Sequence, residues 1–517
     1  MTTTTTFKDV FDLPEWKPLA VQTVTNAVGM CNCSDMRNSE DRIPIIFYLT
    51  SAANLYRYNY KNDGISLAHN ALGLAGTFGA GACSIVMPSR GPRGTLTAVA
   101  SASKMTLSAL PNSASIGINQ FAQRPGDDIG YKIRIYDKTI GKMDEKYIIA
   151  NTSGNTPTIT LDSALSFTPT TSANYELLSG RVYMLNAGTN AAGIFKYFDI
   201  ATQTINTTAL ANTNLPATVG TDSCFVALDE GYIPCDATFS TGFFGQCTAS
   251  ASTTTSITIT CPQTMLASEL VGFQVRVIQD TGTVGAVGQR RKITASTAGT
   301  SVTLTVPTWT TQPSSTAVVV IENNNDLVLF SSGSTNVYCY DQEANTWATA
   351  TYAARGAAVG AGLMAFQPFG VSKAVYISDP DRNFRYTTIH TFSGGGATTL
   401  SILNLHTNTW ENAVAYQTSA ANTFNTGSCL EYDAVSTNNA GRFAYINQNA
   451  TTAFFRYNAH ARTIEEWTQL RYPQSTATVG SRMALASYID SSDGSKYGFL
   501  TLCLNSRTDM FQILAQR

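Results

Sequence analysis

The feature that most constrains this chain is a polar turn that recurs just before a tryptophan. "YDQEANTW" occupies residues 340–347, and the related "LNLHTNTW" occupies residues 403–410. A looser copy, "RYNAHARTIEEW", ends at Trp467. A strand and turn repeated in this way indicates an array of similar units, because one such unit cannot bury its apolar face alone.

The spacing after the tryptophan strengthens this interpretation. An interval of thirteen residues separates a tryptophan from a glycine in three places: Trp16 and Gly29, Trp347 and Gly360, and Trp467 and Gly480. Two further copies have isoleucine at the tryptophan position, Ile65 and Ile205, and Trp410 leads to Gly427. These six transitions indicate six copies of one structural unit.

Each unit contains four strand-like apolar runs separated by Gly, Asn, Asp and Ser turns. Four-stranded units in series are typical of β-propellers. The last run, 510–515, has no fourth strand after it, and we expect the segment 15–21 to supply one. Such closure leaves no sheet edge exposed. The sequence therefore predicts an all-β, six-bladed β-propeller closed by the N-terminal strand, with each recurring Trp or Ile packed between neighbouring blades.

Two segments interrupt the repeat and resemble each other. "GYKIRIYD" (130–137) parallels "GFQVRVIQD" (272–280), and both segments end in a Thr-rich strand pattern. We expect each to be a small β-domain inserted between the first and second strands of consecutive blades. A shorter insertion lies at 368–386, and all three should project from one face. The predicted domains are propeller at 1–92, 180–239 and 323–517, and inserted β-domains at 93–179 and 240–322.

Composition excludes some functions. Charged residues are 13% of the chain and the formal net charge is −2, against roughly 25% charged residues in an average globular protein. We noted no cluster of Lys and Arg, so we do not expect a nucleic-acid partner. No apolar run reaches 18 residues, so no membrane insertion is expected. The start, "MTTTTTFKDV", lacks the layout of a secretory signal.

Catalytic motifs are missing from the sequence. The four histidines, His69, His390, His406 and His460, have no metal-ligand spacing. There is no nucleophile elbow and no phosphate-binding loop. The segment 491–499 weakly resembles the Asp-box of sialidases, but a plain turn is favoured. We therefore predict that the protein is not an enzyme and has no catalytic, cofactor-binding or metal residues and no cofactor.

Several other residues admit two interpretations. Asp127, Asp128 and Asp137 offer oxygen ligands for calcium, although solvated turns are favoured. Arg134 and Arg276 occupy matching places in the two insertions, where support of a turn is favoured over ligand binding. The cysteines are expected to be buried small hydrophobes. Cys247 and Cys261 could face each other across a hairpin, and whether they form a disulfide stays open.

Two resemblances give these patterns a functional context. The "YDxxxNTW" turn, with "SGGG" at 393–396, resembles kelch-type propeller repeats. The inserted segments resemble small β-domains in structural proteins of tailed bacteriophages. This second resemblance implies a virion component of the tail, neck or nozzle, whose partners are copies of itself in a ring and other virion proteins. The alternatives are a carbohydrate- or receptor-binding protein that contacts a host surface glycan and, disfavoured for lack of paired carboxylates, a glycan-degrading enzyme.

Overall fold

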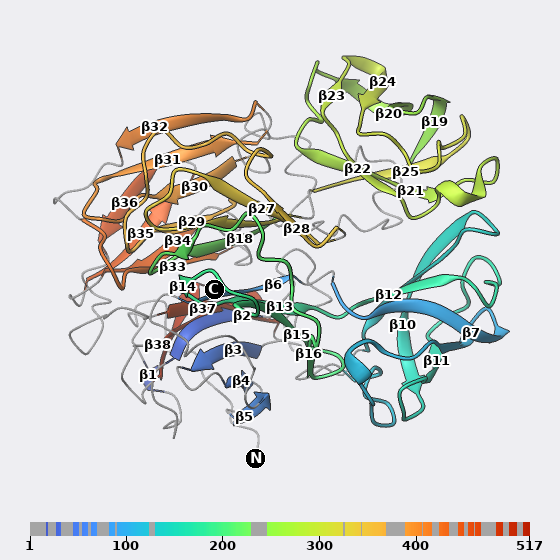
Figure 1. Ribbon diagram of the computed structural model, residues 1–517, viewed down its shortest axis with the longest axis horizontal. Coiled ribbons are helices and arrows are strands. Elements are labelled where there is room, and N and C mark those ends of the chain that lie inside the picture. The colour runs from blue at the N-terminus through green and yellow to red at the C-terminus, as the bar shows by residue number, and fades with distance from the viewer. Residues whose placement is uncertain are drawn as a thin grey trace.

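The fold is described from a computed structural model (Figure 1). The described residues are 17–18, 27–32, 45–50, 54–59, 64–69, 82–87, 90–123, 130–228, 246–323, 326–342, 344–368, 388–405, 407–415, 423–433, 443–448, 453–459, 461–466, 482–489, 496–503 and 510–516. In these ranges helix is limited to two short 3-10 turns, η2 (Pro111–Ser113) and η4 (Val284–Ala286). The predicted all-β fold class is confirmed.

Six four-stranded antiparallel sheets make up the larger part of the molecule. Sheet 1 contains β2 (Ala27–Asn32), β3 (Ile45–Thr50), β4 (Leu55–Asn59) and β5 (Gly64–His69); sheet 2 contains β6 (Cys83–Met87), β13 (Arg181–Leu185), β15 (Phe195–Asp199) and β16 (Thr204–Ile205); sheet 3 contains β18 (Cys224–Leu228), β26 (Asp326–Phe330), β27 (Val337–Asp341) and β28 (Thr346–Ala348). A short pair, β14 (Gly188–Thr189) and β17 (Thr218–Val219), joins sheets 2 and 3.

The remaining three sheets follow the same antiparallel order. Sheet 4 contains β29 (Met364–Phe366), β30 (Thr388–Phe392), β31 (Thr399–Asn404) and β32 (Thr409–Ala415); sheet 5 contains β33 (Cys429–Asp433), β34 (Phe443–Asn447), β35 (Phe454–Asn458) and β36 (Thr463–Glu466); sheet 6 contains β37 (Arg482–Ile489), β38 (Lys496–Cys503), β39 (Met510–Gln516) and β1 (Lys17–Pro18).

The first strands of these sheets contact one another in a closed circle. β2 contacts β6, and the contacts continue through β18, β29, β33 and β37 back to β2. The two ends of the chain meet in sheet 6, where Lys17 of β1 lies opposite Gln512 of β39. The predicted pairing of the N-terminal and C-terminal strands is therefore present, and the sheets form a propeller-like arrangement.

The recurring polar turn has one geometry in four sheets. The last residue of the third strand accepts a hydrogen bond from the backbone N–H three residues later; these acceptors are Asp199, Asp341, Asn404 and Asn458. The residue after that donor has a φ of 51–56°, at Gln203, Asn345, Asn408 and Arg462. Asp and Asn suit the acceptor position because their short side chains bond to nearby backbone. Asn, which stands at the positive-φ position in two of the four turns, tolerates that conformation better than most residues.

The tryptophans that follow these turns pack between sheets, as expected. Trp347 of sheet 3 lies 5.1 Å from the ring of Phe195 in sheet 2, and its indole donates to the carbonyl of Ala211 at 2.9 Å. Trp410 of sheet 4 repeats this arrangement, donating to the carbonyl of Ala353 at 2.7 Å. Each indole therefore ties its sheet to the chain segment that precedes it.

One alignment of the repeat was wrong. In sheet 5 the residue that pairs as Trp347 does is Ile464, which lies opposite Tyr457 just as Trp347 lies opposite Tyr340. Trp467 comes three residues later and lies outside the described residues, as does Trp16. The tryptophan-to-glycine interval for that copy therefore rested on the wrong residue. Turn geometry, not tryptophan itself, defines the repeat.

Two further bodies lie beside the sheets, and together they form one thirteen-stranded sheet. Module 1 (residues 93–178) contains β7 (Arg93–Ser101), β8 (Lys104–Leu107), β9 (Lys132–Asp137), β10 (Lys142–Asn151), β11 (Thr158–Leu161) and β12 (Asn174–Leu178). Module 2 (residues 246–323) contains β19 (Gln246–Ser252), β20 (Ser256–Met265), β21 (Phe273–Gln279), β22 (Arg290–Lys292), β23 (Ala295–Ser296), β24 (Gly299–Thr305) and β25 (Val318–Asn323).

Strand order is the same in the two modules. Module 1 runs β11-β8-β7-β12-β9-β10, and β10 also pairs β11, which closes a six-stranded barrel. Module 2 runs β24-β20-β19-β25-β21-β22. The modules meet where Lys142 of β10 lies opposite Gln279 of β21. Module 1 follows β6 and precedes β13, which pair with each other, and module 2 likewise lies between β18 and β26. The shorter predicted insertion at 368–386 lies almost entirely outside the described residues.

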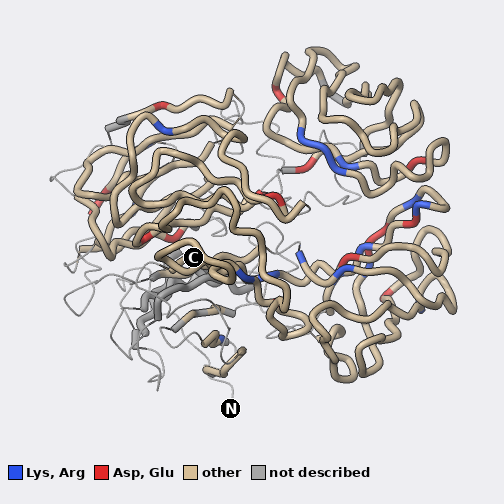
Figure 2. The backbone as a smooth tube through the Cα atoms, in the orientation of Figure 1, with Lys and Arg blue, Asp and Glu red and all other residues tan. Residues whose placement is uncertain are grey.

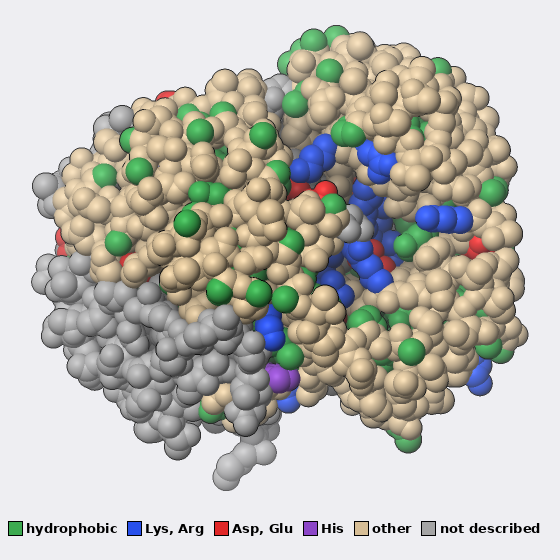
Figure 3. Space-filling model, viewed as in Figure 1, with side chains coloured by type: hydrophobic (Ala, Val, Ile, Leu, Met, Phe, Trp, Pro, Cys, Tyr) green, Lys and Arg blue, Asp and Glu red, His purple; other side chains and the backbone are tan. Residues whose placement is uncertain are grey.

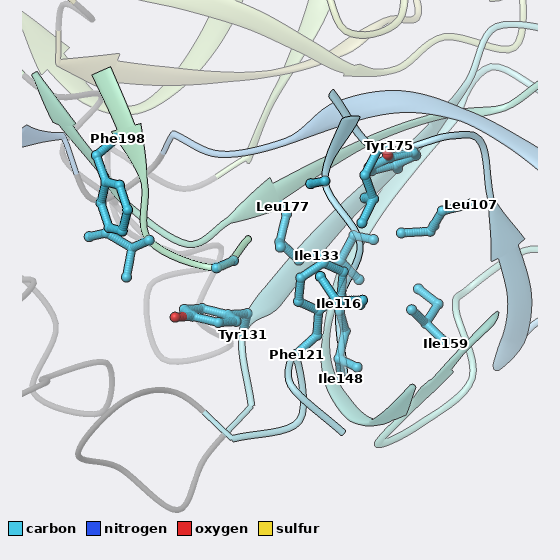
Figure 4. Close-up of a cluster of buried hydrophobic side chains, with 14 of the residues drawn as sticks. Leu107, Ile116, Phe121, Tyr131, Ile133, Ile148, Ile159, Tyr175, Leu177 and Phe198 are labelled. Carbon is cyan, nitrogen blue, oxygen red and sulfur yellow. The ribbon is translucent and has the colours of Figure 1, made fainter. Parts of the chain in front are cut away.

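Module 1 shares its core with the neighbouring sheets. Its buried cluster includes Ile133, Ile148 and Tyr175 and extends to Phe198 of β15 (Figure 4). Phe47 of β3 belongs to the same cluster and lies 5.9 Å from the ring of Phe198. Module 1 is therefore anchored to sheets 1 and 2 by apolar packing, which is the dominant stabilising term in folding.

Candidate functional site

A cavity of about 470 Å³ lies between the two modules and sheet 3. Basic side chains gather in this hollow (Figure 3), where β22 of module 2 faces mixed basic and acidic strands of module 1 (Figure 2). We call it the arginine cavity. Its charged lining residues are Arg93, Arg134, Glu176, Arg276, Arg290, Arg291, Lys292, Asp326 and Asp341.

Glu176 of β12 is the hub of the charge network on the module 1 side. Its Oε1 lies 3.0 Å from Arg90 and 2.7 Å from Arg93, and its Oε2 lies 3.3 Å from Arg134 and 3.4 Å from Arg290. Burial alone raises the pKa of this carboxyl, but the four cations outweigh burial and hold the pKa well below 4.5. Glu176 is therefore ionised and links the two modules, since Arg290 belongs to module 2.

Arg134 and Arg276 lie on strands, not in turns, and they share a carboxylate. Glu145 of β10 lies 2.6 Å from Arg134 and 4.0 Å from Arg276. Arg276 also pairs with Glu322 of its own module. Burial raises the pKa of Glu145, but Arg134 and Arg276 lower it overall. The two matching arginines thus form part of the wall between the modules, which corrects the expectation that they support turns.

Lys292 joins module 2 to sheet 3. Its ammonium lies 2.6 Å from Asp326 at the start of β26, and Tyr352 donates to the same carboxylate oxygen at 2.9 Å. Burial tends to lower the pKa of Lys292, but Asp326 outweighs it and the pKa is raised. The lysine is therefore charged. Ion pairs thus connect the three parts of the molecule that surround the cavity, which are module 1, module 2 and sheet 3.

Arg291 differs from the other cations because none of its hydrogen bonds goes to a carboxylate. It donates to the carbonyls of Thr308 and Arg290, at 3.0 and 2.7 Å, and to the side chains of Thr310 and Gln289. Its guanidinium lies 5.4 Å from the centre of the Trp309 ring. Burial lowers its pKa, but arginine stays protonated in proteins. Its positive charge is therefore not neutralised by these partners.

The cavity carries an excess of positive charge, in contrast to the whole chain. Six cations and three carboxylates line it, although the chain has a net charge of −2. The expectation that the chain has no Lys/Arg cluster is therefore wrong. Part of the signal was visible as the run "RRK" at 290–292, but the other cations come from strands far apart in the sequence. Guanidinium groups suit carboxylate and phosphate, so the cavity is a candidate anion site.

The two described histidines, His69 and His390, do not line this cavity. His390 is fully buried in sheet 4, with its Nδ1 3.0 Å from the Tyr457 hydroxyl, and His69 packs against Phe198. His406 and His460 lie outside the described residues. Within the described part of the chain, no group of three His, Cys, Asp or Glu side chains is arranged to hold a metal, and no helix has the length and hydropathy of a membrane span.

Asp137 is not a solvated turn residue. It is fully buried, and its oxygens accept hydrogen bonds from the backbone N–H groups of Thr139, Ile140 and Thr170 at 2.6–3.2 Å. Burial raises its pKa, but these hydrogen bonds lower the pKa overall. The carboxylate therefore fastens its own loop. Asp127, Asp128 and the turn at 491–495 lie outside the described residues.

Cys247 and Cys261 meet across the β19–β20 hairpin, as the sequence suggested. Both are buried thiols that no disulfide joins. Hydrogen bonding between the two thiols lowers the pKa of Cys247 and raises that of Cys261. The side chains of Cys83, Cys339 and Cys429 are buried as well. They pack as small apolar side chains, in agreement with the sequence analysis.

Comparison with known proteins gives similarity only at the level of solved structures. No protein-family model matches the chain, and no curated protein sequence matches it. A structure of the mitotic checkpoint complex aligns with 99% of this chain and 95% of its own, at 10% identity and a TM-score of 0.34. YCF48 bound to a peptide aligns over 98% and 97%, at 9% identity and a TM-score of 0.33.

A third solved structure is the GH74 xyloglucanase from Xanthomonas campestris. It aligns with 95% of this chain and 53% of its own, at 11% identity and a TM-score of 0.29. YCF48 and this xyloglucanase are β-propeller proteins. Similarity at these TM-scores carries no argument about function, so the function is argued from the residues of this chain.

Proposed function

We propose that this protein is a six-bladed β-propeller with two inserted β-domains that acts by assembly and not by turnover, as a structural component of a tailed-phage virion. In this proposal the six sheets are the blades of a rigid disc. The modules are its platform, and they contact copies of the same chain and other proteins of the tail, neck or nozzle. The protein is then located in the virion.

The observation that carries the proposal is the pair of like modules fastened to each other and to the disc. Both modules have one strand order, a buried ion pair between Glu176 and Arg290 connects module 1 to module 2, and a partly exposed pair between Lys292 and Asp326 connects module 2 to sheet 3. Buried pairs hold a fixed geometry at a cost in desolvation. A protein that presents two rigid modules side by side suits a geometric role between neighbouring subunits.

The interface area is consistent with this role. Specific protein interfaces typically bury about 1,200–2,000 Å² in total. Modules of this size are large enough to contribute such an area. Resemblance of the inserted segments to β-domains of tailed-phage structural proteins supplies the virion assignment, and the kelch-type resemblance supports the blade assignment.

Removal of module 1 tests the proposal. Residues 93–178 would be replaced by a short Gly-Ser linker, which the geometry permits because Met87 and Arg181 are directly paired neighbours. Arg90→Ser would be included, since Arg90 loses its partner Glu176. Circular dichroism and gel filtration should show a folded chain, and purified virions should lack it by immunoblot.

Normal incorporation of the folded deletion variant would contradict the assembly role of module 1. A separate assay measures sugar release by the full-length chain from the surface polysaccharide of the bacterial host. Release at a measurable rate would replace the structural proposal with the glycan-degrading alternative. Saturable binding of that polysaccharide without release would favour the receptor-binding alternative.

A further inference from the structure

We propose that Cys247 and Cys261 form a reversible redox switch in module 2. A small two-electron oxidant joins their sulfurs in a disulfide that connects β19 to β20, and a thiol reductant separates them again. This inference concerns the isolated chain and does not depend on a role in a virion. It follows from the register of the hairpin, the contact between the two thiols, and the place of β19 and β20 in the module.

The register of the hairpin sets the two cysteines opposite each other. Ala249 of β19 lies opposite Ile259 of β20, and the irregularity in this pairing lies beyond that pair, toward the turn. Side chains two residues apart share a face of the sheet, so Cys247 and Cys261 continue the row that this pair begins. All four side chains belong to the buried core of module 2.

Backbone hydrogen bonding shows which kind of pair the cysteines form. The N–H of Ala249 donates to the carbonyl of Ala317, which precedes β25, at 2.8 Å, so it points away from β20. Backbone polar groups two residues apart in a strand point the same way, so those of Cys247 also point away from β20. In such a non-hydrogen-bonded antiparallel pair the Cα atoms are about 4.5 Å apart. This separation lies within the range of about 4.4–6.8 Å that a disulfide spans.

The two thiols are in hydrogen-bond contact, and their surroundings give them different roles. This bond lowers the pKa of Cys247, against the effect of burial. The same bond, burial and the charges of Cys247 and Glu269 raise the pKa of Cys261. Because the thiolate is the reactive form, Cys247 reacts with the oxidant first and Cys261 is the resolving cysteine.

Hydrogen peroxide suits this pair because it is a small oxidant, and the two cysteines are only 2% and 3% exposed. The sulfur of Cys247 attacks one peroxide oxygen, the O–O bond breaks, and the departing hydroxide takes the thiol proton as water. The sulfur of Cys261 then attacks the sulfenic sulfur of Cys247, the S–O bond breaks, and the hydroxide leaves with the second thiol proton as water. Two thiols thus lose two electrons and two hydrogens, and one peroxide becomes two waters.

The disulfide would connect the two halves of module 2. β20 pairs with β24, whereas β19 pairs with β25, which leads through β21 to module 1. Thirteen residues separate the two cysteines, and closing a loop of about this length lowers the population of the opened hairpin by up to roughly a hundred-fold. A Cα separation near the short end of the disulfide range strains the bond, and strained disulfides are the more easily reduced ones, which suits a reversible switch.

The test treats the folded full-length chain with hydrogen peroxide, removes the peroxide with catalase, and maps the cysteines by alkylation in urea and peptide mass spectrometry. We expect the peptide that contains Cys247 and Cys261 to lose two hydrogens and to take up no alkylating reagent, and dithiothreitol to reverse this in the folded chain. Amide hydrogen exchange in 246–261 should slow at least about ten-fold in the linked form.

Two variants accompany the native chain. Cys261→Ala should remove both the link and the slower exchange. Cys83→Ala is the matched control, because Cys83 is also buried but lies opposite Leu185. This variant should form the link as the native chain does.

Every other outcome overturns the proposal. Two alkylated thiols in a peroxide-treated chain that stays folded would contradict it, and so would sulfinic or sulfonic acid at Cys247 without a link. A link that dithiothreitol leaves intact in the folded chain would show that the bond is not a reversible switch. Unchanged hydrogen exchange in the linked form would show that the bond does not stabilise the hairpin. If Cys261→Ala unfolds, the native chain before and after dithiothreitol still decides, because that comparison needs no substitution.

Discussion

The two modules share a fold but differ in the charge opposite one matching arginine. In module 1 the residue directly across from Arg134 is Glu176, and in module 2 the residue across from Arg276 is Val320. Arg276 therefore pairs instead with Glu322 and approaches Glu145 of the other module. The residues on the other side of each arginine differ as well, because Glu145 lies opposite Arg134 and Arg290 lies opposite Arg276. Module 1 therefore has two carboxylates where module 2 has an apolar residue and a cation, which makes the two modules complementary.

Both modules have a buried aspartate that accepts hydrogen bonds from loop backbone N–H groups. Asp137 is the last residue of β9 and Asp280 directly follows β21, the strands that carry the matching arginines, and both aspartates are fully buried. Asp280 accepts backbone hydrogen bonds from Gly282, Thr283 and Ser314 at 2.7–3.0 Å. These are the counterparts of the bonds that Asp137 makes. The carboxylates that shape each module are thus retained, and those that face the partner module have diverged.

The largest expected effect comes from Glu176→Gln, which breaks the network on which the comparison rests. Arg90, Arg93, Arg134 and Arg290 would lose their shared carboxylate, and Arg90 is fully buried. Removing one partner of a buried ion pair costs about 3–5 kcal/mol. Urea unfolding should show a loss of this size. Glu411→Gln, which removes an exposed partner of Arg462, should cost less than about 1 kcal/mol.

The same carboxylate predicts a pH dependence. The folded-state pKa of Glu176 lies well below 4.5, so its contribution is present above that value and is lost as pH falls through the folded-state pKa. Between pH 6 and pH 3 the native chain should lose more stability than the Glu176→Gln variant. If the free energy of unfolding of the two proteins changed equally with pH, Glu176 would not have the lowered pKa that the ion pairs imply.

Asp137→Ala and Asp280→Ala should each lower the free energy of unfolding by a similar amount, which is smaller than the loss expected for Glu176→Gln. Each leaves buried backbone N–H groups without an acceptor, which costs about 1–3 kcal/mol. Limited proteolysis should cut near Thr170 in the first variant and near Ser314 in the second. A loss confined to one of the two variants would show that the loops are not equivalent, and the comparison between the modules would then fail.

Most of the repeat could be predicted from the sequence because it depends on local chemistry. An Asp or Asn acceptor and a residue with positive φ sit close together in the chain, so turns such as 341–345 leave a visible pattern. The misplacement of Trp467 has the same origin. The repeat position is defined by its distance from the turn, and in sheet 5 the residue that follows the turn at Arg462 by that distance is Ile464. A search for tryptophan alone therefore selects Trp467, three residues too late.

The arginine cavity could not be predicted in the same way. Its charges come from β7, β9, β12, β21, β22, β26 and β27, and only the pairing and packing of strands far apart in the sequence brings them together. Arg134 and Arg276 were recognised as equivalent, but their carboxylate partners lie 11–46 residues away along the chain, as Glu145 and Glu322. Nothing in a low overall charge of 13% indicates that the cations converge.

A double-mutant cycle between Glu176 and Arg290 tests most directly the claim that diverged charges tie module 1 to module 2. The two side chains are 3.4 Å apart and belong to different modules. Unfolding free energies would be measured for the native chain, Glu176→Gln, Arg290→Gln and the double variant, and coupled residues typically show interaction energies of about 0.5–3 kcal/mol. We predict a favourable coupling of at least about 1 kcal/mol, above that of the exposed pair Glu411 and Arg462. A coupling of zero would contradict the account.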